Sequence, residues 1–96
     1  MVVLILERAK PSLRGEVTRW LMQAQAGVFI GYLSARVRDL LWKKVEAAGA
    51  NAAGTMICSD NSEQGFSVRH FGRPERVFQD FDGIFLAKTL EKGQNP

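Results

Sequence analysis

Glu7 is the clearest candidate for chemistry in this sequence, because it directly follows the apolar run of residues 2–6. Such a run predicts a strand buried on both faces. Proteins that combine helices and strands often place ligand groups where a strand ends. In a symmetric dimer, two copies of Glu7 could approach each other and hold Mg²⁺ through oxygen ligands. The alternative is an ordinary surface ion pair with a basic neighbour: Arg8, Lys10 or Arg14.

The other side chains that could act as nucleophiles or metal ligands lack suitable partners. Cys58 ends an apolar segment and is expected to be a small core residue. His70 is the only histidine and is expected to be structural, because no zinc-ligand partner accompanies it. Four acids are expected to serve turn geometry: Asp60, Glu63, Asp80 and Asp82. The sequence therefore predicts no nucleophilic catalysis.

Basic residues concentrate in the first half of the chain. Residues 1–44 carry eight lysines and arginines against three acids, whereas residues 45–96 carry five against seven. This asymmetry favours one side that faces a polyanion and another that faces a different partner, although chance clustering on solvated helix faces is the alternative. Backbone and shape recognition of nucleic acid is expected, without base readout. The candidate phosphate contacts are Arg14, Arg36, Arg38, Arg73 and Arg76.

A first helical pattern carries Arg14. Pro11 and Ser12 open this helix, with Ser12 as its expected N-cap, and Gly27 ends it. Arg14 falls in the first turn, where free backbone N–H groups and the helix dipole favour phosphate. The expected apolar stripe consists of Leu13, Val17, Leu21 and Ala24, with Trp20 beside it.

A second helical pattern carries Arg36 and Arg38. Ser34 is its expected N-cap and Gly49 ends it. Trp42 on this helix, like Trp20 on the first, is expected to pack in the core or a dimer interface. The expected apolar side consists of Leu33, Val37, Leu40, Leu41 and Val45.

The order of the elements indicates the fold class. Strands are expected at residues 2–6, 28–30, 52–58, 66–71 and 84–90, with a very short one at 32–33. This order predicts an α+β, ferredoxin-like βαββαβ sandwich with extra C-terminal strands and both helices on one face. The other face of the sheet would be bare in a monomer, so a symmetric homodimer is expected.

Size and composition indicate one soluble domain. Residues 1–90 are expected to form it, and residues 91–96 a disordered tail. The apolar run of residues 2–6 is far below the ~20 residues needed to span a bilayer. It also lacks the features of a signal peptide, so no membrane association is expected. The single cysteine fits a reducing compartment, and a cytoplasmic location is expected.

Several short motifs, in the same order and at similar spacing, make nearly the whole chain resemble a known family. The sequence resembles the second core CRISPR-associated adaptation protein, an endoribonuclease-like family, and within it the type I-E subfamily. The motifs of the first half are Leu13-Arg14-Gly15, Trp20-Leu21, Ala26-Gly27-Val28-Phe29-Ile30-Gly31, Ser34-Ala35-Arg36-Val37-Arg38 and Trp42. Those of the second half are Ser62-Glu63-Gln64-Gly65-Phe66, Phe71-Gly72 and Asp82-Gly83.

This resemblance implies a ferredoxin-like symmetric dimer within the CRISPR spacer-acquisition complex. There the dimer would bridge two dimers of the integrase subunit and hold double-stranded protospacer and repeat DNA. The integrase partner performs the transesterification, so the resemblance implies a non-catalytic DNA-binding scaffold. Residues 77–90 would form the strand region that docks onto the integrase.

The resemblance also assigns roles to individual residues. Arg14 matches an arginine of the type I-E pattern that contacts the DNA backbone, whereas the preceding basic position is Ser12 here. Glu75 and Arg76 match a later arginine pair, of which only Arg76 is basic, with Arg73 nearby.

Glu7 matches an acidic residue that the family uses for divalent metal in its nuclease activity. A metal-dependent endonuclease acting on RNA or DNA, with Mg²⁺ held by Glu7 across the dimer axis, is therefore the alternative function. A single acidic residue per chain offers few metal ligands for such an endonuclease, and no general base accompanies it. A small assembly module without a nucleic-acid role is a third possibility.

Overall fold

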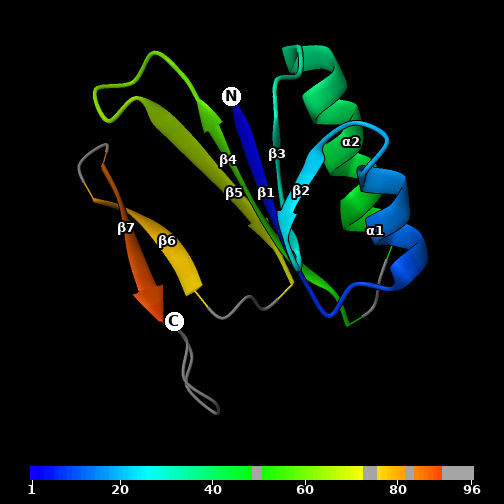
Figure 1. Ribbon diagram of the computed structural model, residues 1–96. Helices are drawn as coiled ribbons and strands as arrows, with labels where there is room; N and C mark the ends of the chain where they lie inside the picture. Colours follow the sequence, from blue (N-terminus) through cyan, green and yellow to red (C-terminus); the bar gives the residue numbers. More distant parts are fainter. Residues whose placement is uncertain (49–50, 73–75, 82–83, 90–96) are drawn as a thin grey trace.

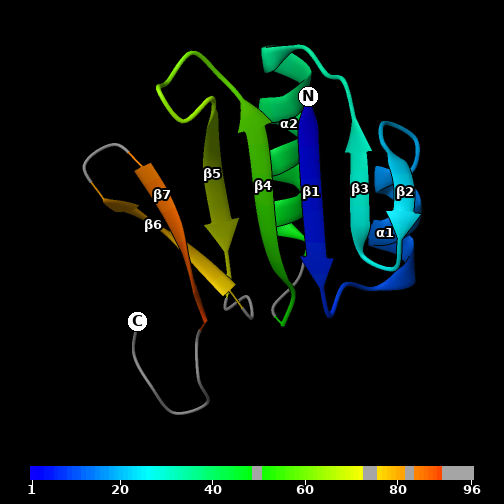
Figure 2. The same ribbon diagram turned by 60° about the vertical axis from the view of Figure 1, so that its left-hand side comes forward.

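The computed structural model describes residues 1–48, 51–72, 76–81 and 84–89, with side chains in the first two of these ranges. The main sheet has the strand order β2-β3-β1-β4-β5, and every neighbouring pair is antiparallel. Helices α1 (Pro11–Val17) and α2 (Ala35–Ala47) both lie on one face of this sheet (Figures 1 and 2). The strands are β1 (Val2–Glu7), β2 (Met22–Gln25), β3 (Val28–Gly31), β4 (Ala53–Ser59) and β5 (Phe66–Phe71). The fold is therefore α+β, with the βαββαβ order of a ferredoxin-like sandwich.

The hydrophobic core lies between the sheet and the two helices. On the sheet side, Leu4 is the register partner of both Phe29 and Met56, and all three side chains are fully buried. On the helix side, Val17 of α1 and Val45 of α2 are equally buried. Burial alternates along β1, because successive side chains of a strand point to opposite faces. The expectation that β1 is buried on both faces is therefore wrong for the single chain.

The face of the sheet that points away from the helices carries a group of half-buried apolar side chains, together with the polar Glu7, Thr55 and His70. Its residues alternate with the core residues and align across the strands, as in the pairs Val3↔Ile30, Val3↔Ile57 and Ile57↔Val68. We call this apolar surface the open face. It consists of Val3, Ile5, Val28, Ile30, Ile57, Phe66 and Val68.

The first helix is much shorter than predicted. It ends at Val17, and residues 22–25, expected to continue the helix, form β2 and pair with β3. This pairing overrides the moderate helix propensity of the segment. Gly27 has a φ of 77° and closes the turn between the two strands. Leu21 is buried as expected. Trp20 is 49% exposed, so it does not pack in the core of the single chain, and its packing in a dimer interface stays a prediction.

The N-terminus of α1 also differs from the prediction. Lys10 occupies the N-cap position without a side-chain cap, so Ser12 is not the cap. Pro11 stands at the first helical position, where its fixed φ and missing N–H are tolerated.

The second helix agrees well with its prediction. Ser34 is its N-cap, and its Oγ accepts a hydrogen bond from the Val37 amide at 3.3 Å. Trp42 is buried and makes an edge-on contact with Phe71, with ring centroids 5.3 Å apart. Leu40, expected on the apolar side, is 59% exposed because it points away from the sheet. Neither described helix is long and apolar enough to span a bilayer.

Residues 32–34, between β3 and α2, form no strand, contrary to the expectation for 32–33. The expected end of α2 at Gly49 lies outside the described residues, although α2 itself ends at Ala47.

Two further strands, β6 (Arg76–Phe81) and β7 (Ile84–Thr89), form a separate antiparallel sheet on the β5 side of the molecule (Figure 1). The sequence predicted extra C-terminal strands but placed Asp80 in a turn. Asp80 instead lies within β6, since the apolar residues around it favour a strand. Asp82, Leu90 and the tail at 91–96 lie outside the described residues.

Candidate functional site

Arg14 lies in α1, and its side chain contacts the loop between β1 and α1. Its side chain is half-buried, and Nη1 donates a hydrogen bond to the carbonyl of Ala9 at 3.2 Å. This contact orients the guanidinium while its other N–H groups can bind an anion. The helix dipole adds little here, since α1 has only seven residues.

Glu7 lies at the end of β1, as predicted, and is half-buried. It has an interaction partner within the chain. The next residue, Arg8, has a left-handed φ of 56°, and its Nε donates to the carbonyl of Asn51 at 2.9 Å. Within the part of the chain that the structure describes, no group of three or more His, Cys, Asp or Glu residues could hold a metal ion. A magnesium site at Glu7 therefore stays a prediction that needs a second copy of the chain.

Arg36 and Arg38 lie near the start of α2. Arg36 is exposed, whereas Arg38 is half-buried and donates from Nε to Oδ1 of its neighbour Asp39 at 3.2 Å. The positive end of the dipole of this 13-residue helix adds to the charge of both arginines. The structure thus places both predicted arginines in an anion-favouring environment.

A third arginine joins Arg38 from the edge of the sheet. Arg69 of β5 donates from Nη2 to the same Oδ1 of Asp39, at 2.7 Å. The hydrogen bond from Arg69, helped by Arg38, lowers the pKa of Asp39 below its ordinary value. Burial raises the pKa of the Cys58 thiol, and the charges of Arg38 and Arg69 oppose that rise. We call Arg38, Asp39 and Arg69 the Asp39 cluster.

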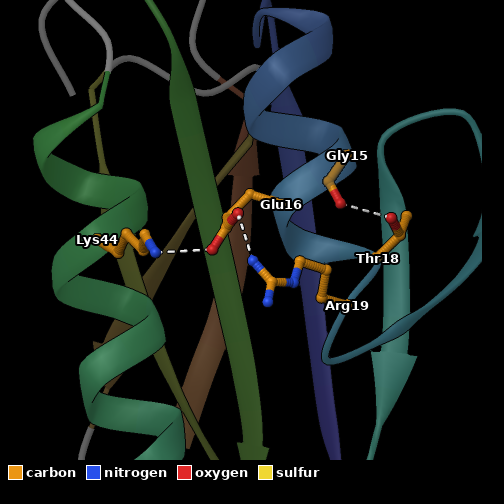
Figure 3. Close-up of polar contacts among 5 residues, drawn as sticks. All are labelled: Gly15, Glu16, Thr18, Arg19 and Lys44. Atoms are coloured by element: carbon orange, nitrogen blue, oxygen red, sulfur yellow. Dashed lines mark hydrogen bonds and ion pairs between the residues drawn. The ribbon is translucent and has the colours of Figure 1, made fainter.

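A second shared carboxylate links the two helices (Figure 3). Lys44 of α2 donates from Nζ to Oε1 of Glu16 at 2.7 Å, and Arg19 approaches Oε2 at 3.4 Å. The hydrogen bond from Lys44 is the main cause that lowers the pKa of Glu16. Thr18 donates from Oγ1 to the Gly15 carbonyl at 2.6 Å and tightens the end of α1. We call Glu16, Arg19 and Lys44 the Glu16 cluster.

An apolar hollow adjoins the Glu16 cluster. It has a volume of about 170 Å³ and is lined by Trp20, Val37, Leu40, Leu41 and Lys44. Sites for small molecules usually enclose about 300 Å³ or more and bring several polar groups together. This hollow therefore does not suit a cofactor or a metabolite.

The remaining candidate residues are either structural or lie where the structure does not describe the side chain. Cys58 is a buried core residue, as predicted, and Asp60 serves a turn by accepting from the Ser62 amide at 2.9 Å. His70 is exposed on β5. Arg73 lies outside the described residues, and for Arg76 only the backbone is described. The structure thus places Arg36 and Arg38 near the start of α2, on different sides of the helix, and Arg14 separately on α1.

A comparison with models of protein families shows which family the chain belongs to. The model of one family, described as CRISPR-associated protein (Cas_Cas2CT1978), matches residues 1–86. The chain belongs to this CRISPR-associated family. The match covers every element that carries a described candidate residue, from β1 to β5, and extends into β7. It agrees with the family resemblance seen in the motifs and is consistent with a role in CRISPR adaptation.

Sequence reasoning missed Arg69 of this CRISPR-associated protein. Strand alternation places Arg69 on the same face as Phe71, and therefore on the face that carries the helices. This signal was present in the sequence, but its meaning depends on β5 being the edge strand beside α2.

Proposed function

We propose that this chain is a non-catalytic, DNA-binding scaffold of the CRISPR spacer-acquisition complex, of the type I-E kind. As a homodimer it holds double-stranded protospacer and repeat DNA and bridges two dimers of the integrase subunit. The integrase carries out the transesterification, and this chain supplies binding and spacing. Membership of the CRISPR-associated family over residues 1–86 is the observation that carries the proposal.

The arginines support a role in binding DNA backbone. Arg14 stands on α1, and Arg36 and Arg38 stand on α2. Arginine pairs well with phosphate oxygens because its planar guanidinium presents several N–H donors. Contacts of this kind position a duplex without reading its sequence, which suits a protein that must accept many different spacers.

The open face supports the homodimer. A monomeric protein rarely leaves seven neighbouring apolar side chains of a five-stranded sheet only half-buried, because their contact with water is unfavourable. A second copy would cover this surface with an identical one, as two-fold symmetry allows. Dimerisation would also bury the second face of β1, which fits the apolar sequence of that strand.

The C-terminal strands support a docking role toward the integrase. Among the described strands, β6 and β7 pair only with each other, so their outer edges can accept another strand. The acidic character of residues 45–96 separates this region from the basic first half. We therefore place the integrase contact at residues 77–90.

Titration of a fluorescently labelled duplex tests the proposal. We expect the wild-type protein to bind duplex of any sequence at low salt, and Arg14→Gln to weaken binding. Arg19→Gln is the matched control, because it removes one arginine charge from the end of α1 without touching the proposed contacts. Wild-type protein that binds no duplex at low salt would refute the proposed function. Equal losses of duplex affinity in the two variants would show that Arg14 does not contact the DNA.

A further inference from the structure

Two guanidinium groups from distant parts of the sequence meet on one carboxylate oxygen. Arg38 of α2 and Arg69 of β5 both donate to Oδ1 of Asp39, at 3.2 Å and 2.7 Å. The Asp39 cluster therefore carries two positive charges against one negative charge. Without the carboxylate between them, the two positively charged guanidinium groups would repel each other.

The arrangement leaves both guanidinium groups able to bind a further anion. Asp39 accepts from one nitrogen of each arginine, Nε of Arg38 and Nη2 of Arg69, and each group has other N–H donors. The side chains of Arg38 and Arg69 are 23% and 36% exposed, so they are held in place and still reach solvent. Two oriented, partly exposed guanidinium groups form a fork that suits the two free oxygens of a phosphodiester.

The Glu16 cluster provides an instructive contrast. It also joins two cations on one carboxylate, but Arg19 lies just beyond the end of α1 and Lys44 in the last turn of α2. The negative end of a helix dipole opposes anion binding there, whereas Arg38 lies near the positive end of α2. The Arg19 side chain is also 70% exposed and correspondingly less fixed.

We propose that Arg69 and Arg38 together bind one phosphodiester group of duplex DNA, with Asp39 holding their guanidinium groups side by side. This inference rests on the proposed function and adds Arg69 to its interface. The site stands on α2 and the sheet edge at β5, whereas Arg14 stands on α1. The chain would thus hold DNA backbone at two separate places.

Duplex binding of Arg69→Gln, measured beside wild type and Arg19→Gln, tests the inference. Each lost phosphate contact reduces the salt slope of binding by about 0.9. The substitution removes one contact from each chain of the proposed dimer, so the deficit of Arg69→Gln should shrink about twelvefold between 50 and 200 mM salt. Arg19→Gln should show a clearly smaller deficit. Equal deficits, or none for Arg69→Gln, would overturn the inference.

Asp39→Asn separates a phosphate contact from a merely structural role of Arg69. This variant removes the negative charge of the cluster, but its amide oxygen can still accept hydrogen bonds from Arg38 and Arg69 and keep them side by side. We expect its duplex affinity to be at or above that of wild type. A loss as large as that of Arg69→Gln would show that only the ion pair matters and would overturn the inference. Wild type and Arg14→Gln in the same titration keep this outcome distinct from failure of the proposed function.

Discussion

The amide of Leu6 donates a hydrogen bond to the carbonyl of Gly27 at 2.7 Å, which seats the turn between β2 and β3 against the end of β1. Gly27 has a φ of 77°, and a Cβ at this position would lie 2.5 Å from the carbonyl oxygen of Leu6. Only glycine fits both the backbone conformation and the space. This contact fixes where the chain turns between β2 and β3.

We therefore expect Gly27→Ala to destabilise the protein by about 1–3 kcal/mol, the usual range for a residue forced into a rare backbone conformation. Urea unfolding of the two proteins measures this difference. Gly15→Ala is the matched control: nothing lies within 4 Å of its Cβ position in α1, and it should stabilise by about 0.5–1 kcal/mol. A Gly27→Ala protein as stable as wild type would contradict this description of the turn.

Replacement of Arg69 should raise the pKa of Asp39 toward its ordinary value of 3.8, because the hydrogen bond from Arg69 is the main cause of its depression. NMR titration of the Asp39 carboxyl carbon in wild type and Arg69→Gln measures this change. The pKa of Glu16 serves as the internal control, since Lys44 is the main cause of its depression. Identical Asp39 titrations in the two proteins would show that the ion pair does not form in solution.

The sign of the pH dependence follows from the same shift. The folded-state pKa of Asp39 lies below its unfolded value, so the unfolded chain takes up a proton first as the pH falls. The ion pair therefore stabilises the fold fully above about pH 4, and this contribution is lost as the pH falls through the lower folded-state pKa.

The sequence predicted the parts of the fold that depend on local signals. Ser34 caps α2 as expected, and the boundaries of β5 agree with the predicted strand at 66–71. The helix prediction for the segment after Val17 was wrong. The apolar spacing of this segment fits a helix, but its pairing with β3 decides its structure. Trp20 became exposed for the same reason.

The candidate site was predictable only in part. Arg36 and Arg38 could be placed on one helix from their spacing, and Ser34 fixed where that helix starts. Arg69 could not be added, because its contact with Asp39 spans 30 residues and depends on the strand order of the sheet. Strand alternation could place Arg69 on the face that carries the helices, but no signal in a single sequence identifies Asp39 as its partner.

A charged residue on the open face should abolish the proposed dimer. Ile57 lies near the middle of this face, between its register partners Val3 and Val68. We expect Ile57→Asp to be monomeric and wild type dimeric by light scattering at micromolar concentration, because the carboxylate would be buried at the two-fold interface. Leu40→Asp, on the exposed side of α2, should leave the dimer mass unchanged. A wild-type protein with the mass of a monomer would contradict the dimer.

Removal of divalent metal should not affect DNA binding. The proposed contacts join arginine directly to phosphate, so EDTA and the Glu7→Ala substitution should both leave duplex affinity unchanged. The titration in EDTA, followed by addition of Mg²⁺, measures this. A loss in EDTA that Mg²⁺ restores, and that Glu7→Ala reproduces, would instead favour the metal-dependent alternative.

The salt dependence of duplex binding tests the central claim most directly. The slope of log K against log salt is about −0.9 for each neutralised phosphate, so Arg14 and Arg38 in both chains of a dimer predict a slope of about −3.6 or steeper. Binding to unrelated duplex sequences should follow the same line. A slope near zero, or no binding at about 50 mM salt, would contradict a scaffold that holds DNA by its backbone.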